Sequence, residues 1–156
     1  MVERLEFPEA LRQELIAHAR EGDPDEVCGI LAGRDGQVSR VFRVNNTADS
    51  VSADSGVFRD RESGVASAGR KPVHYYMDPR DQLRVYNEVD DLGLDVIGYY
   101  HSHTHSEAYP SQTDVEKAVY PDSYWLILSL EDRGEPVLRG FRIDHGEVTE
   151  EEVKIR

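Results

Sequence analysis

Residues 95–114 constrain the fold of this chain more than any other stretch, because they join an apolar run to a helix start through a cluster of histidines. Residues 95–100 are apolar and rich in β-forming side chains, which predicts a buried strand that delivers His101 and His103 at its far end. Side chains alternate along a strand, so the two imidazoles lie on the same face. Residues 110–114, Pro-Ser-Gln-Thr-Asp, then predict the start of a helix. The sequence therefore places a strand end close to a helix start.

The polar side chains of this stretch predict a metal site. Asp114 offers a carboxylate and Ser111 offers a hydroxyl close to the two histidines. Two imidazoles and one carboxylate, with a fourth position left for water, form a ligand set that suits catalytic rather than structural zinc. The prediction is therefore Zn²⁺, although the same donors accept other divalent ions.

A fifth residue upstream completes a recognisable pattern. Glu26 stands at the start of an apolar run, and the order Glu26, His101-x-His103, Ser111-x-x-Asp114 resembles the signature of the JAMM/MPN+ metalloprotease family. The signature is specific, because all five positions and their order fit. The resemblance covers most of the chain, from the first predicted helix to the last predicted strand.

The residues around the signature refine the resemblance. Residues 107–111, Glu-Ala-Tyr-Pro-Ser, are similar to the bacterial and archaeal branch of the family, which includes desampylases and enzymes that process sulfur-carrier proteins. Thr104 follows the second histidine, where many family members have proline. We expect this difference to alter the loop after His103 more than the metal ligands.

The resemblance implies a role for each residue of the signature. His101, His103 and Asp114 would hold zinc, which lowers the pKa of its bound water to about 7. Glu26 would act as the general base that takes a proton from this water and hands it to the leaving amine. The Ser111 hydroxyl, together with zinc, would stabilise the oxyanion. The implied reaction is metal-assisted hydrolysis of a peptide or isopeptide bond.

The resemblance also implies a substrate class. Related enzymes cut after the C-terminal Gly-Gly of a ubiquitin-like or sulfur-carrier protein, and strand addition beside a sheet edge suits such an extended tail. The expected reaction either removes this protein from lysines or releases a cysteine. Two other functions stay open: a zinc-dependent amidohydrolase acting on a small molecule, and a non-catalytic MPN scaffold. The complete ligand set disfavours the scaffold.

Several of these residues also have ordinary structural explanations. Ser111-x-x-Asp114 before an apolar helix is typical of a capping box. Without the resemblance, Glu26 would be one exposed acid among several in an acidic turn. His105 is expected at the loop or rim, because a continuing strand soon runs out of room around one small ion. Cys28 lies in an apolar run, where a small buried side chain is ordinary, so it is not expected to be a nucleophile.

The composition indicates which classes of binding partner and which cellular compartment to expect. A formal net charge of −13 argues against binding to nucleic acid or to an anionic membrane. This acid excess, with three lysines against fifteen arginines, indicates a high-salt or GC-rich source. The N-terminus is acidic and no apolar stretch has membrane-spanning length, so a cytoplasmic protein is expected. A single cysteine excludes an intrachain disulfide and a multi-cysteine zinc cluster. The oligomeric state stays open.

The hydrophobic pattern predicts an α/β fold, in one domain spanning residues 1–156. Helices are expected at 8–20, 79–92 and 111–120, and strands at 27–32, 38–44, 73–77, 95–100, 124–130, 136–143 and 147–155. The resemblance implies a mixed, curved β-sheet flanked by helices, similar to the cytidine deaminase fold. The Cys-x-x-Cys of the deaminases is missing, so their chemistry is not indicated. Residues 46–72 show no period, which predicts a flexible insertion, either an active-site flap or a surface loop without a role.

Overall fold

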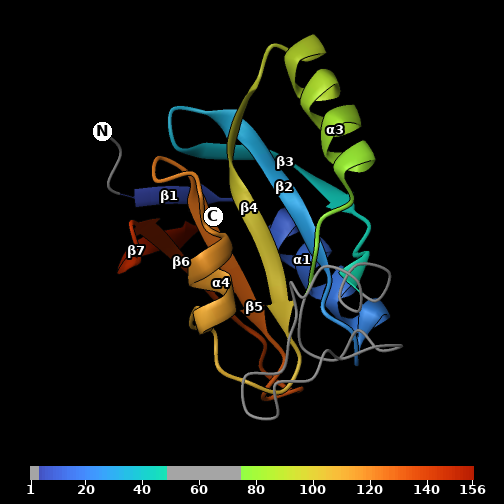
Figure 1. Ribbon diagram of the computed structural model, residues 1–156, viewed down its shortest axis with the longest axis vertical. Helices are drawn as coiled ribbons and strands as arrows, with labels where there is room; N and C mark the ends of the chain where they lie inside the picture. The colour runs from blue at the N-terminus through green and yellow to red at the C-terminus, as the bar shows by residue number, and fades with distance from the viewer. Residues whose placement is uncertain (1–3, 49–74) are drawn as a thin grey trace.

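The computed structural model describes residues 4–48 and 75–156 (Figure 1). The described helices are α1 Glu9–Gly22, α3 Pro79–Asp91 and α4 Gln112–Lys117. The described strands are β1 Arg4–Phe7, β2 Cys28–Arg34, β3 Gln37–Val44, β4 Asp95–His103, β5 Tyr124–Ser129, β6 Val137–Asp144 and β7 Glu147–Ile155. Most of the expected insertion at 46–72 lies outside the described residues.

The strands form one mixed sheet in the order β1-β3-β2-β4-β5-β6-β7. β4 and β5 run parallel, whereas β2 pairs antiparallel with both β3 and β4. The predicted mixed, curved sheet flanked by helices is therefore confirmed. β1 pairs in parallel with both β3 and β7, so the curved sheet closes into a barrel. Strand β1 was not predicted from the sequence, because a strand of four residues is too short to show a period.

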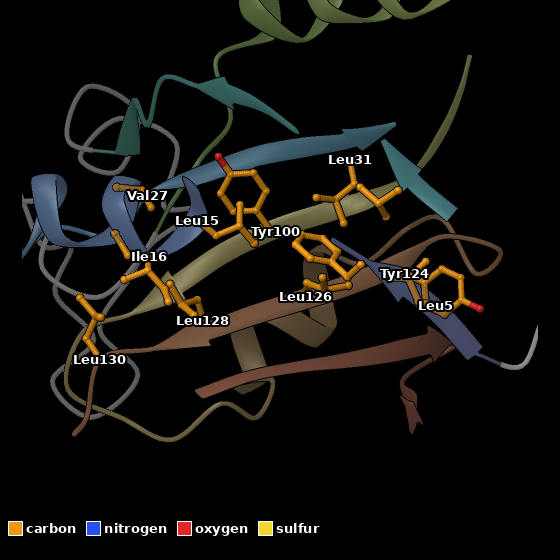
Figure 2. Close-up of a cluster of buried hydrophobic side chains, with 13 residues drawn as sticks. Leu5, Leu15, Ile16, Val27, Leu31, Tyr100, Tyr124, Leu126, Leu128 and Leu130 are labelled. Carbon is orange, nitrogen blue, oxygen red and sulfur yellow. The ribbon is translucent and has the colours of Figure 1, made fainter. Parts of the chain in front are cut away.

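The sheet buries apolar side chains on both of its faces. On one face, Tyr100 of β4 and Leu126 and Leu128 of β5 pack against Leu15 and Ile16 of α1 (Figure 2). On the other face, a second cluster joins alternate residues of the same strands to the inner sides of α3 and α4. Its members include Val85, Val89, Tyr99, Val115 and Trp125. Helices on both faces explain why the central strands are apolar throughout rather than alternating.

Two expected elements differ from the structure. The helix predicted at 111–120 ends at Lys117, because the backbone of Ala118 is already extended, with φ −80° and ψ 92°. The strand predicted at 73–77 is wrong in its described part, where Met77 makes a single bridge with Asn46. There the Asn46 side chain, rather than a continuing ladder, accepts the hydrogen bond from the Tyr76 backbone N–H at 2.9 Å.

The remaining helices begin much as expected. The α3 helix starts at Pro79, and the Asp78 side chain caps it by accepting from the Arg80 backbone N–H at 2.8 Å. The α1 helix spans Glu9–Gly22, slightly longer than predicted. Among the described helices, none combines the length and the apolarity needed to cross a membrane.

Candidate metal centre

The end of β4 places two histidines on one face of the sheet. His101 pairs with Cys28 on β2 and with Ile127 on β5, so its backbone is held from both sides. His103 follows at the last residue of the strand, with its backbone held by Ser129 on β5. Because side chains alternate, both imidazoles share the face that carries α3 and α4. The central position of β4 gives these side chains a rigid base.

The start of α4 places Asp114 against the two histidines. Ser111 is the N-cap: its Oγ accepts from the Asp114 N–H at 3.1 Å, and Asp114 Oδ2 accepts from the Ser111 N–H at 2.9 Å. Asp114 Oδ2 also lies 3.1 Å from His101 Nε2 and 3.0 Å from His103 Nε2. The capping box and the ligand arrangement therefore coexist, and the cap fixes the carboxylate in the ligand position.

The three donor atoms fit a tetrahedral zinc ion. The two Nε2 atoms lie 3.2 Å apart, so all three separations are between 3.0 and 3.2 Å. Zinc bonds of about 2.0–2.1 Å give a tetrahedral edge of roughly 3.3 Å. His103 Nδ1 lies 2.8 Å from the Glu107 carbonyl oxygen. A proton on Nδ1 donates to that carbonyl and leaves the Nε2 lone pair directed at the ligand position.

Burial sets the electrostatics of this group. The exposed fractions are 2% for His101, 4% for His103, 8% for Asp114 and 6% for Glu26. Burial lowers the pKa of His101 and outweighs the pull of Asp114, which favours the neutral form that binds metal. Burial opposes ionisation of Asp114, but the two imidazoles outweigh it and hold its pKa well below the usual range. Asp114 is therefore an anion in a buried site.

Glu26 contributes a second buried carboxyl group. Its backbone carbonyl accepts from Asn46 Nδ2 at 2.9 Å, and the next residue, Val27, donates its N–H to Ser102 Oγ on β4 at 2.9 Å. Within the described residues, Glu26 Oε1 has no hydrogen-bond partner. Burial and the charge of Asp114 raise the pKa of Glu26 well above its usual value, whereas Lys117 opposes the shift. A buried acid without a partner beside a ligand group has the properties of a general base.

Comparison with known proteins connects this geometry to a family. Residues 8–143 match the family model described as prokaryotic homologs of the JAB domain. The chain belongs to this family. The resemblance inferred from the sequence signature is thereby confirmed.

Relatives of this JAB-family chain include proteins named as a peptidase and as a desampylase. A CysO-cysteine peptidase of Mycobacterium bovis is 36% identical over 141 residues, which are 90% of this chain and 84% of the relative. A desampylase of Haloferax volcanii is 35% identical over 134 residues, 83% of this chain and 84% of the relative. The solution structure of DSY2949 from Desulfitobacterium hafniense superimposes with a TM-score of 0.77 at 33% identity, covering 97% of this chain and 92% of that one.

The JAB-family signature omits two residues that the structure brings to the site. The Tyr75 ring stacks on the His101 ring with centroids 4.5 Å apart and an interplanar angle of 24°. The Lys117 ammonium lies 3.6 Å from the Tyr75 ring centroid. Lys117 has a sequence signal, since it follows Asp114 by three residues and so shares a helix face with it. Tyr75 has none, because its contact with His101 depends on the tertiary fold.

His105 and Cys28 lie apart from the three donor atoms. Within residues 4–48 and 75–156, the buried donors close enough to share an ion are His101, His103 and Asp114. His105 is exposed, and its Nδ1 lies 2.9 Å from Thr104 Oγ1. Cys28 is fully buried and its Sγ donates to the Val44 carbonyl at 3.5 Å. Burial raises the pKa of the Cys28 thiol to about 12.

Proposed function

We propose that this chain is a zinc-dependent metallopeptidase that hydrolyses the peptide or isopeptide bond after the C-terminal Gly-Gly of a ubiquitin-like or sulfur-carrier protein. The observation that carries the proposal is the buried group of His101, His103 and Asp114 with Glu26 nearby, whose Oε1 has no hydrogen-bond partner among the residues that the structure describes. The relatives named CysO-cysteine peptidase and desampylase support a protein substrate of this class. We assign His101, His103 and Asp114 to the metal, and Glu26 and Ser111 to catalysis.

Glu26 carries out the proton transfers in this mechanism. When bound, zinc supplies a Lewis acid and an activated water at neutral pH. Glu26 removes a proton from the attacking water and then passes it to the leaving nitrogen. Its raised pKa suits both steps, since a carboxyl group titrating closer to neutral pH both accepts and returns a proton. The surrounding burial keeps competing water away from the carboxyl group.

Ser111 serves the helix cap and the oxyanion at once. A hydroxyl has one donor hydrogen and two acceptor lone pairs. Capping uses an acceptor lone pair, because Ser111 Oγ accepts from the Asp114 N–H. The hydroxyl hydrogen is therefore left to donate to the oxyanion that develops on the substrate carbonyl. The donor and acceptor count of one hydroxyl therefore allows both uses.

The test compares substrates and variants in one set of assays. Wild type should bind one zinc and cleave a ubiquitin-fold protein joined through its C-terminal glycine to lysine or to cysteine, at low or high salt. Glu26→Gln should keep zinc and lose about 10²–10⁴-fold in kcat/KM. His103→Ala should lose both zinc and cleavage, whereas His105→Ala, a matched histidine outside the donor group, should keep both.

Other outcomes favour the competing functions. Bound zinc with cleavage of small amides but of no protein conjugate would indicate a small-molecule amidohydrolase. Absence of zinc in wild type would leave a non-catalytic scaffold of the same fold. Full activity of Glu26→Gln would remove Glu26 from the mechanism while keeping the metal assignment.

A further inference from the structure

The two ligand histidines are oriented by different means. The ring of His103 is fixed through its second nitrogen, because Nδ1 lies 2.8 Å from the Glu107 carbonyl. Within the described residues, both hydrogen bonds of the His101 ring are made by Nε2, the ligand nitrogen itself. The His101 ring instead rests against Tyr75, with centroids 4.5 Å apart and the planes within 24° of parallel. Its orientation therefore depends on an aromatic contact.

Tyr75 is itself held from its other side. The His101 ring covers one face of the Tyr75 ring. The Lys117 ammonium lies 3.6 Å from the Tyr75 ring centroid, and we infer that it lies over the opposite face, because the first face is already covered. Lys117 Nζ also donates a hydrogen bond to the Tyr75 backbone carbonyl. Tyr75 is 5% exposed, and a cation held over a buried aromatic ring is attracted more strongly than one at an exposed ring.

The three stacked side chains of Lys117, Tyr75 and His101 are connected at both ends to the elements that carry the proposed ligands. Lys117 is the last residue of α4, the helix that supplies Asp114 in its first turn. His101 is supplied by β4, so the order Lys117, Tyr75, His101 links the two elements that carry the ligands. Tyr75 and Lys117 also line a cavity of about 400 Å³ together with Tyr99, Tyr120 and Trp125. Removing the Tyr75 ring would give the His101 ring space to turn toward this cavity.

We propose that Tyr75 and Lys117 are positioning residues that fix the ring of His101 for metal binding. This inference rests on the proposed function, because it assigns His101 to the metal. Tyr75 limits the rotation of the imidazole, and Lys117 holds Tyr75 in place through its ring and its carbonyl. Groups that orient a metal ligand from outside the coordination sphere typically contribute 10–100-fold to metal affinity. Neither residue belongs to the group of donor atoms close enough to share an ion.

The test measures metal binding directly, without turnover. Tyr75→Leu removes the ring and keeps an apolar side chain, and Lys117→Met removes the ammonium and keeps the length. Both variants should bind zinc about 10–100-fold more weakly in competition with a chelator. With Co²⁺ in place of zinc, both should also change the visible absorption bands that report ligand geometry. Tyr75→Phe and Lys117→Arg, which keep the ring and the cation, should restore affinity and spectrum.

A matched control separates positioning from general stability. Tyr124→Leu removes an aromatic ring that lies under the Arg142 guanidinium, in the apolar cluster facing α1, and should leave affinity and spectrum unchanged. Wild-type affinity and spectrum in folded Tyr75→Leu and Lys117→Met would overturn the proposal. If one of the two does not fold, the other decides. Failure of wild type to bind zinc would instead overturn the proposed function itself, so the two failures are distinguishable.

Discussion

The two faces of β4 differ in what their side chains do, although the residues alternate along one strand. Tyr100 faces α1 and belongs to the apolar cluster between the sheet and this helix. His101 and His103 face the opposite side, where polar groups are buried with the donors of the candidate metal centre. Burial of apolar area on the first face stabilises the folded state, whereas removal of polar groups from water on the second face destabilises it. Variants on the two faces should therefore separate folding from chemistry.

The largest expected effect on folding comes from the face toward α1. Leu126 is fully buried against this cluster, so Leu126→Ala should lower the free energy of unfolding by about 2–5 kcal/mol. Its kcat/KM and zinc content should stay at wild-type values, because the side chain points away from the ligands. Chemical denaturation and a cleavage assay below the transition measure the two quantities. A loss of zinc from folded Leu126→Ala would show that the two faces are coupled.

The opposite pattern is expected at Ser111. Loss of the Oγ donor in Ser111→Ala should reduce kcat about 10²–10³-fold, the usual cost of losing one oxyanion donor. The same change removes an N-cap and should cost about 1 kcal/mol of stability. Ser111→Asp restores a capping acceptor without a hydroxyl donor, so it should recover stability but not activity. Recovery of activity in Ser111→Asp would confine Ser111 to the cap.

A pH-dependent effect is expected on the face toward α1. His18 on α1 lies 2.8 Å from the Tyr100 hydroxyl, and burial lowers the pKa of His18 to about 4, with Arg43 adding to the shift and Glu21 opposing it. Between pH 6.5 and about 4 the His18 imidazole is protonated in the unfolded state but neutral in the folded state. The free energy of unfolding therefore decreases as the pH falls through this range.

Comparison with His18→Gln isolates this contribution from the titration of the many carboxylates. The wild type should lose more stability than His18→Gln between pH 7 and about 4, as measured by denaturation at each pH. Cleavage at neutral pH should be the same in both proteins. Parallel stability curves for the two proteins would show that His18 titrates alike in the folded and unfolded states.

The sequence predicted the parts of the site that depend on local order. His101 and His103 follow from strand alternation, and Asp114 from a helix start a few residues later. Glu26 could be chosen only through the family resemblance, because it lies far from the histidines in sequence and joins them through the pairing of β2 with β4. The stacking of Tyr75 was beyond prediction, since it depends on how segments outside the sheet pack against it.

The fold shows the same division. Long apolar runs predicted the central strands and the flanking helices, because periodicity survives over such lengths. The closure by β1 was missed, since its partner β7 lies at the far end of the chain and local pattern carries no information about it. The early end of α4 was not predicted, because Pro121 restricts only Tyr120, whereas the backbone already leaves the helix at Ala118.

The smallest effect is expected at Cys28, which lies on the same face as the ligands. Its thiol is fully buried opposite His101 on β2, and burial raises its pKa to about 12. The thiolate is the reactive form, so an alkylating reagent at pH 8 should leave the folded protein unmodified and fully active. Mass spectrometry should show a single adduct only after denaturation. Inactivation in step with modification of the folded protein would mean that Cys28 is accessible and takes part in the chemistry. Unchanged activity of the unmodified protein would agree with a buried thiol that has no part in the chemistry.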